Sequence, residues 1–197
     1  MSLASKKQQY VDQSTVAQSG VSLIEVLIAI VIASIGLLAL AGVNASSIRY
    51  TKMSQYRGTA TLLATDLGER MRANLAGRAS YGLGDDFATQ AALPAAPATI
   101  CHPTSVLTNP YTVQCSAAQL AADDLQTWRV RVRDQLPEGS AFIAIQNVQT
   151  AADVWIVWRD PAVASDDLGA ATGECPAALS IGTADKSVRC SYFRFNL

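Results

Sequence analysis

A single carboxylate, Glu25, lies at the start of a long apolar stretch. It follows Gly20 by five residues, and the next 18 residues, Val26–Val43, are interrupted only by Ser34. A spanning helix needs about 20 apolar residues, so this run is long enough to cross a bilayer. A charge inside such a helix costs about 2.5–3.5 kcal/mol on insertion scales, so the carboxylate indicates a function.

The apolar run differs from a core helix and from a secretory signal. Soluble helices carry an apolar stripe with a period of 3.6 residues, whereas this run is apolar on all sides. A signal peptide has an apolar block of about 7–15 residues close to its basic residues, but Lys6 and Lys7 lie far upstream. We expect a membrane-inserted helix at about residues 21–43; the alternatives are a core helix and a cleaved signal.

The four cysteines all follow the apolar run: Cys101, Cys115, Cys175 and Cys190. Their spacing contains no Cys-x-x-Cys metal or redox motif. An even number on one side of a membrane indicates two disulfides in an oxidising compartment. Of the three possible pairings we favour Cys101–Cys115 and Cys175–Cys190, because each closes a short loop. In the chain-entropy model each bridge would stabilise the folded state by about 3 kcal/mol. The alternative is four reduced thiols in the core.

Patterns for catalysis are absent from the sequence. His102 is the only histidine, so a structural role is expected for it. Three acidic pairs fall in or near loops and turns, and we expect solvated carboxylates there, with calcium binding as the alternative: Asp85-Asp86, Asp123-Asp124 and Asp166-Asp167. The sequence has no phosphate loop, nucleophile elbow or zinc signature. We therefore expect no enzyme, no cofactor and no metal site.

Charge and length limit the kinds of partner and the number of domains that the chain can have. Lys and Arg number 15 against 16 Asp and Glu, which gives no electrostatic case for nucleic acid as the main partner. The 197 residues leave room for one soluble domain after the membrane helix. Lys6 and Lys7 favour a cytoplasmic N-terminus, and the basic residues just after the apolar run argue weakly against it. The cysteines, which we expect to form disulfides, indicate that the domain after the membrane helix (the head) lies outside the cytoplasm.

The elements that must position these residues begin with one long helix, from about residue 22 to residue 76. Apolar residues continue past the membrane run at steps of three and four: Tyr56, Ala60, Leu63, Leu67, Met71 and Leu75. Gly77 is the expected C-cap, and no proline occurs between Val21 and Pro94. The alternative is two helices broken near residues 42–44.

The head reads as mixed α and β. Four prolines make residues 91–110 a loop, and Ser116 with Gln119 forms a capping box for a helix that ends near Pro137. Within that helix, residues 128–133 also alternate like a strand. Alternating or apolar runs predict three strands, at 141–148, 154–160 and 188–197. An antiparallel sheet packed on the long helix follows, with Trp155 and Trp158 on opposite faces.

The N-terminal residues resemble the class III signal of type IV pilins and pseudopilins. The features in common are Gly20, the stretch Ser22-Leu23-Ile24-Glu25-Val26 and the apolar helix. The stretch from Asp66 to Asn74 is similar to one in PilV-type minor pilins (type IV pilus modification proteins), and Val154–Asp160 looks like a strand of that group. The chain departs from the family at Val21, where phenylalanine is usual.

The resemblance implies an α+β, type IV pilin-like fold in three parts: a cleaved leader (1–20), the N-terminal helix (21–76) and a periplasmic head (77–197). It implies that a prepilin peptidase cuts between Gly20 and Val21 and that the new N-terminus is methylated. Glu25 would be needed for subunits to stack in the filament.

The location implied is the inner membrane, with a cytoplasmic N-terminus, and then the pilus filament or its tip. Partners would be other minor pilins, the major pilin, inner-membrane lipid and the assembly platform, in a system that drives twitching motility. The alternatives are a type II secretion minor pseudopilin and a single-pass membrane receptor whose head binds a ligand.

Overall fold

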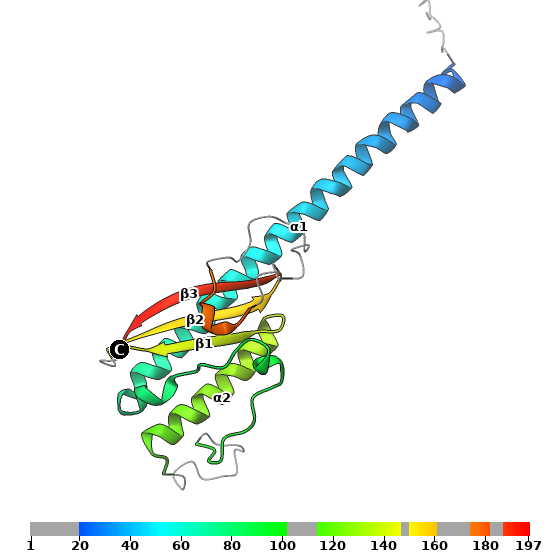
Figure 1. Cartoon of the computed structure of the whole chain (residues 1–197). Coiled ribbons are helices and arrows are strands. Elements are labelled where there is room, and N and C mark those ends of the chain that lie inside the picture. Colours follow the sequence, from blue (N-terminus) through cyan, green and yellow to red (C-terminus); the bar gives the residue numbers. More distant parts are fainter. Residues whose placement is uncertain (1–19, 102–113, 147–149, 161–173, 182–186) are drawn as a thin grey trace, which may run out of the picture. The chain divides into compact units, whose positions relative to one another are not determined.

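The computed structural model describes residues 20–101, 114–146, 150–160, 174–181 and 187–197 (Figure 1). Two compact units divide the chain, Met1–Ser46 and Ser47–Leu197, and helix α1 belongs to both. The elements in chain order are α1 (Leu23–Ala73), η1 (Leu75–Tyr81), η2 (Thr89–Ala91), α2 (Ala117–Gln135), β1 (Ser140–Ile145), β2 (Ala151–Arg159), η3 (Ala177–Leu179) and β3 (Val188–Asn196). The predicted α+β class, a long apolar helix with an antiparallel sheet, is confirmed.

The long helix is a single element, so the alternative of two helices is wrong. Helix α1 runs through residues 42–44 without interruption and ends at Ala73, three residues earlier than predicted. The prediction that Gly77 caps it is also wrong, because Gly77 lies within the 3-10 helix η1. A Cβ at Gly77 would collide with the carbonyl of Ala117, so glycine allows η1 to approach the start of α2.

In the second unit, one stripe of α1 is buried as the period predicts. Ala60, Leu63, Leu67 and Met71 are buried in the main core of the head. Leu75 does not continue this stripe and is half exposed, because the chain has already left the α-helix there. The stripe thus attaches the last four turns of α1 to the head.

Helix α2 confirms the predicted capping box. The side chain of Ser116 accepts a hydrogen bond from the Gln119 N–H, and the side-chain oxygen of Gln119 accepts one from the Ser116 N–H. The helix continues to Gln135, so the alternative of a strand at 128–133 is wrong. Residues 92–101 have no helix or strand, as expected for the proline-rich loop, and the rest of that loop lies outside the described residues.

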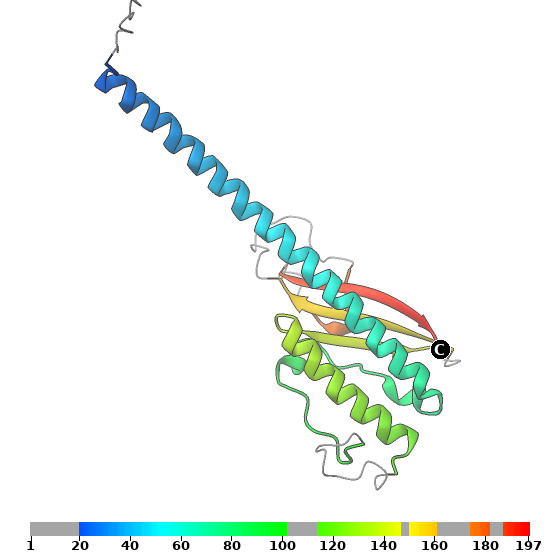
Figure 2. The ribbon, with the colours of Figure 1, turned by 180° about the vertical axis from the view of Figure 1, so that it is seen from behind.

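The sheet has the order β1-β2-β3, and both strand pairs are antiparallel. Figure 2 shows the head portion of α1 and helix α2 on the same face of this sheet. Trp158 is fully buried on that face, between the sheet and the helices. Trp155 points to the other face, where it contacts Phe142 and Tyr192, so the predicted division of the two tryptophans is confirmed.

A smaller core covers part of the opposite face of the sheet. Val157, Val188 and Cys190 from the strands pack with Leu179 of η3. The strands differ from prediction mainly at their ends: β2 begins three residues earlier than expected, at Ala151, and β1 ends at Ile145. Residues 147–148 of the predicted first strand lie outside the described residues.

Candidate functional site

The first candidate site is the beginning of α1. Gly20, Val21 and Ser22 precede the helix, and the Ser22 carbonyl accepts hydrogen bonds from the N–H groups of Glu25 (3.0 Å) and Val26 (3.2 Å). Glu25 therefore lies in the first helical turn, where a negative charge is favoured by the unpaired N–H groups of the helix. The predicted cleavage position, Gly20–Val21, lies outside the regular helix, two residues before it begins.

An apolar hollow extends along α1 from Glu25. Val21, Glu25, Ala29 and Ala33 recur at four-residue steps, and with Val26 and Ile30 they line an open groove of about 490 Å³. The alanines leave the backbone accessible, which is what allows another helix to approach closely in a membrane. Gly36, the next glycine along the helix, does not line this groove. The carboxylate thus stands beside a surface suited to a second apolar helix.

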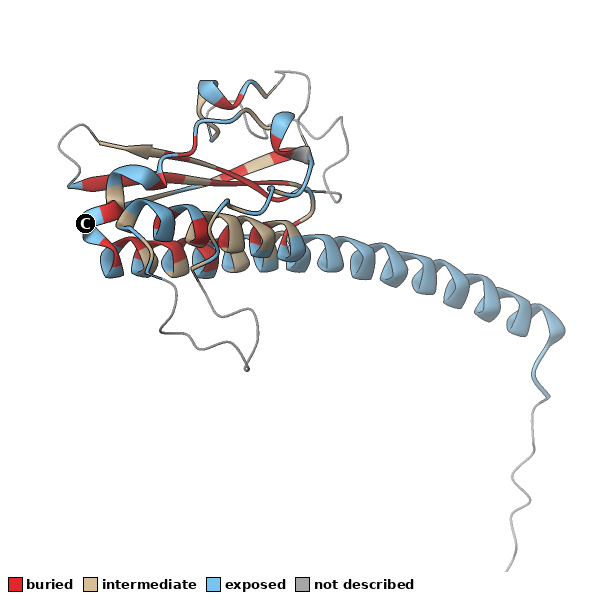
Figure 3. Cartoon of the chain, turned by 90° about the horizontal axis from the view of Figure 1, so that it is seen from below, coloured by how far each residue is buried: buried red, intermediate tan, exposed pale blue. Residues whose placement is uncertain are grey.

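All described residues of the first unit are exposed (Figure 3). The exposed fractions of its large apolar side chains run from 45% at Val26 to 91% at Leu23. Helix α1 is long enough and apolar enough to cross a membrane. Burying such side chains is worth about 1.5–3 kcal/mol each, so this surface requires lipid or other apolar helices around it.

The second candidate site is a polar network between α1 and α2. The guanidinium of Arg70 donates to Asp66 four residues earlier in α1, at 3.3 Å, and to Asp124 of α2 at 2.9 Å. It also reaches the Thr127 hydroxyl at 3.3 Å. Because Arg70 and Asp124 are each about four-fifths buried, solvent screens their attraction less than at the surface.

Tyr81 and Asn74 extend this network into η1. The Tyr81 hydroxyl donates to Asp124 at 2.6 Å, and the Asn74 amide donates to the Ala117 carbonyl at 2.8 Å. The expectation of solvated carboxylates at Asp123-Asp124 is therefore wrong: Asp123 is buried, and Asp124 holds two partners from other elements. Burial, and then the hydrogen bond to Asp124, raise the pKa of Tyr81 far above its ordinary value.

This shift predicts how Tyr81 titrates. A tyrosine whose pKa is raised by folding stabilises the head below pH ~10, and that stabilisation is lost as the pH rises further. In an absorbance titration at 295 nm, Tyr81→Phe should match the wild type until the head unfolds. A loss of one tyrosine's amplitude near pH ~10 in Tyr81→Phe would show that Tyr81 ionises as a solvated phenol.

The stretch from Asp66 to Asn74, noted in the sequence for its resemblance, is where these contacts concentrate. Asp66, Arg70 and Asn74 follow one another at four-residue steps, whereas Leu67 and Met71 enter the core. A Cβ at Gly68 would lie 2.9 Å from the ring of Phe195, so glycine allows β3 to approach here. The stretch thus joins α1 to α2, η1 and β3.

The four cysteines form two disulfides in the head. These are the two pairings predicted from the sequence, in which each bridge closes a short loop. Cys101 pairs with Cys115 and Cys175 with Cys190, with Cα atoms 6.0 and 5.2 Å apart. The second bridge attaches the residues before η3 to β3 and belongs to the smaller core.

The carboxylates of Asp85 and Asp86 lie close to polar groups of α2 and of η2, respectively. Asp85 lies 3.8 Å from Arg129, and Asp86 accepts from the Thr89 N–H, which lowers the pKa of Asp86. Both His102 and Asp166-Asp167 lie outside the described residues. No group of three or more potential metal ligands occurs in the part of the chain that the structure describes.

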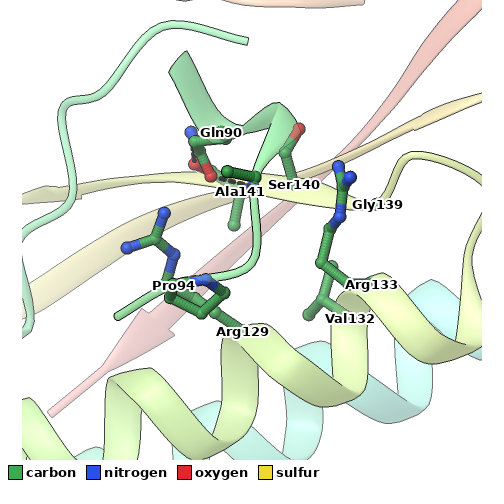
Figure 4. A pocket seen from close by; sticks show the side chains of 9 residues that line it. Gln90, Pro94, Arg129, Val132, Arg133, Gly139, Ser140 and Ala141 are labelled. Carbon is green, nitrogen blue, oxygen red and sulfur yellow. Dashed lines mark hydrogen bonds between the residues drawn. The ribbon is translucent and has the colours of Figure 1, made fainter. Parts of the chain in front are cut away.

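A small cavity lies between α2 and β1 (Figure 4). Arg129 and Arg133 of α2 line it together with Gln90 and with Ser140 and Ala141 of β1. The Gln90 amide donates to the Ala141 carbonyl at 2.8 Å and accepts from the Ala141 N–H at 3.1 Å. The cavity measures about 10 Å³, room for about one water molecule. We therefore assign the cavity to packing.

Comparison with known sequence families gives a match at the N-terminus. Residues 16–41 match the sequence family described as "Prokaryotic N-terminal methylation motif", the leader of type IV pilin-like proteins. The matched segment contains Gly20, Val21 and Glu25 and most of the apolar run. No curated protein and no solved structure matches the chain.

Proposed function

We propose that this chain is a minor pilin, made as a membrane-anchored precursor and built into a type IV pilus, where it primes or modifies assembly. The observation that carries the proposal is Glu25 at the start of an exposed apolar helix, within a matched N-terminal methylation motif. Three parts follow: a leader (1–20), the N-terminal segment that contains α1 (21–76) and a periplasmic head (77–197). No contact in the described residues requires a catalytic role for the head.

Processing creates the partner of Glu25. Cleavage after Gly20 by a prepilin peptidase frees the amine of Val21, which is cationic below a pKa of about 7.7–8.0. Methylation of this amine leaves it able to hold a proton. In a bundle of staggered α1 helices, the Val21 ammonium of one subunit meets the Glu25 carboxylate of the next. The pair neutralises two charges that are each costly in lipid.

The partners and the location follow from this mechanism. The groove along Val21, Ala29 and Ala33 receives α1 of the major pilin or another minor pilin. Before assembly the apolar helix lies in inner-membrane lipid, with the N-terminus in the cytoplasm and the assembly platform beside it. The two disulfide pairs support a head in the oxidising periplasm.

Intact mass of the membrane-extracted protein tests the processing step. The mature chain should lack residues 1–20 and carry about 14 Da for one added methyl group. A Gly20→Ala variant should keep its leader and its unmodified mass, because the peptidase cuts after the glycine. Wild-type protein that retains its leader would contradict the proposal and support the single-pass receptor.

Gene deletion separates the pilus from the secretion system, since the matched motif is shared by pilins and pseudopilins. A minor pilin predicts fewer surface pili and loss of twitching, with enzyme secretion unchanged. Lost secretion with normal pili would indicate that the chain is a type II secretion pseudopilin, which would assemble through the same pairing of Val21 and Glu25.

A further inference from the structure

Strand β3 forms an edge of the sheet, and every second residue on it directs its backbone away from β2. The Leu197 N–H donates to the Thr150 carbonyl, and the Asp160 N–H donates to the Ser187 carbonyl. In an antiparallel pair the bonded positions alternate, so the odd-numbered residues of β3 bond to β2. The even-numbered residues Cys190, Tyr192, Arg194 and Asn196 therefore direct their N–H and C=O groups outward.

These outward groups have no backbone partner among the residues that the structure describes. At the opposite edge of the sheet, by contrast, outward backbone groups of β1 do have hydrogen-bond partners. The Gln90 amide bonds both backbone groups of Ala141, and Leu83 exchanges two backbone hydrogen bonds with Ile143, at 2.8 and 3.0 Å. The chain thus covers the β1 edge with its own residues. On β3, where Val188 and Cys190 are buried, the described residues leave the edge exposed from Tyr192 to Asn196.

An open groove runs beside the middle of this edge. Arg57 and Thr61 of α1 form one wall, and residues Cys190–Phe193 of β3 form the other. Its volume is about 490 Å³. Glu174 lies at the groove and pairs with Arg57 at 3.5 Å. A strand added at the usual spacing of about 4.8 Å from β3 would enter this space.

We propose that the β3 edge receives an extended strand from a different subunit of the assembly, which becomes the fourth strand of the sheet. The outward N–H and C=O groups recur at every second residue, and an extended polypeptide main chain is the ligand that satisfies such a row. About five residues would cover Tyr192–Asn196. This inference rests on the filament role proposed above.

Side chains around the edge define the chemistry of the incoming strand. Tyr192 is half exposed and stacks on Trp155, with ring centroids 4.9 Å apart, so an aromatic or β-branched residue opposite Tyr192 is favoured. On the helix side, Arg57, Thr61 and Glu174 favour an uncharged polar side chain that forms hydrogen bonds. The strand is therefore amphipathic, with its apolar side beside Tyr192.

A different subunit fits better than a second copy of this chain. Two β3 strands paired antiparallel about a two-fold axis would turn one copy upside down relative to the other. The proposed filament requires the α1 helices of all its subunits to run in the same direction. A strand from another subunit meets the edge without that inversion.

Two substitutions at Arg194 isolate the backbone contact. Arg194→Pro removes an outward N–H and leaves the bonds between β2 and β3, and proline is tolerated at such edge positions. Arg194→Ala keeps that N–H and removes only a side chain that lies 3.8 Å from Asp153. We expect incorporation into sheared filaments to fall at least tenfold for the proline variant and to stay within twofold for the alanine variant. Equal incorporation of both would overturn the inference.

Hydrogen exchange of the wild-type full chain provides a second test that does not depend on a variant. The amides of Tyr192, Arg194 and Asn196 should exchange rapidly in detergent micelles and at least 100-fold more slowly in filaments. Equal rates in both states would contradict strand addition. Slow exchange in micelles together with a dimeric mass would identify a second copy as the occupant and overturn the proposed one. Wild-type protein missing from filaments would instead refute the proposed function.

Discussion

Glu25→Ala is expected to prevent incorporation of the subunit into filaments and to leave its membrane insertion and leader cleavage intact. Removing the carboxylate lowers the cost of insertion by about 2.5–3.5 kcal/mol, so the precursor should enter the membrane at least as well as the wild type. In the filament, however, the Val21 ammonium of the neighbour would be left without its partner. Breaking a buried pair from one side costs about 3–5 kcal/mol, which corresponds to a loss of incorporation of at least about 100-fold and up to several thousand-fold.

Western blots of membranes and of sheared filaments measure the two steps separately. Ser34→Ala is the matched control, since it removes the other polar side chain of the same apolar run. The Ser34 hydroxyl donates to the carbonyl of Val31 in its own helix, at 2.8 Å, so no intersubunit bond is lost. The control should assemble normally. Normal assembly of Glu25→Ala would show that the carboxylate has no part in stacking.

The elements of this fold could be predicted because their signals are local. The apolar run, the 3.6-residue stripe of α1 and the capping box of Ser116 and Gln119 each lie within a few turns of chain. The three strands likewise follow from short alternating runs. Errors occur at the ends of elements, as at Gly77, where the structure depends on how closely η1 approaches Ala117. No local pattern encodes that approach.

The polar network between α1 and α2 was not predicted, because its contacts also join residues far apart in the sequence. Asp124 looks like a surface carboxylate in the sequence, because Arg70 lies 54 residues away and Tyr81 lies 43 residues away. The spacing of Asp66, Arg70 and Asn74 by four residues was visible and indicates a polar face on α1. What that face would contact depends on the packing of α2. The covering of β1 by Gln90, 51 residues from Ala141, is a further long-range contact of this kind.

Arg70 and Arg72 show how differently two neighbouring arginines can contribute to stability. The Arg70 side chain is one-fifth exposed and holds Asp66, Asp124 and Thr127. Arg70→Ala would leave Asp124 beside Tyr81 without its counter-charge. Because hydrogen bonds to charged groups are worth about 1.5–3 kcal/mol and one partner would stay buried, we expect a loss of about 2–3 kcal/mol in the unfolding free energy of the head.

Arg72 supplies the matched control from the same stretch of α1. Its side chain is about half exposed, pairs with Glu69 at 2.6 Å and lies 6.0 Å from the centre of the Phe195 ring. Such exposed contacts are worth about 1 kcal/mol or less, so Arg72→Ala should change stability little.

All three tryptophans lie in the head, so their fluorescence in urea reports its unfolding in the full chain held in detergent. At about 1–3 kcal/mol per molar urea, Arg70→Ala should lower the midpoint by about 1 M. The midpoint of Arg72→Ala should stay near that of the wild type. Equal midpoints for the two variants would mean that the contacts of Arg70 with α2 contribute no more than a surface ion pair. In that case the buried apolar stripe of α1 alone would account for the attachment of this helix to the head.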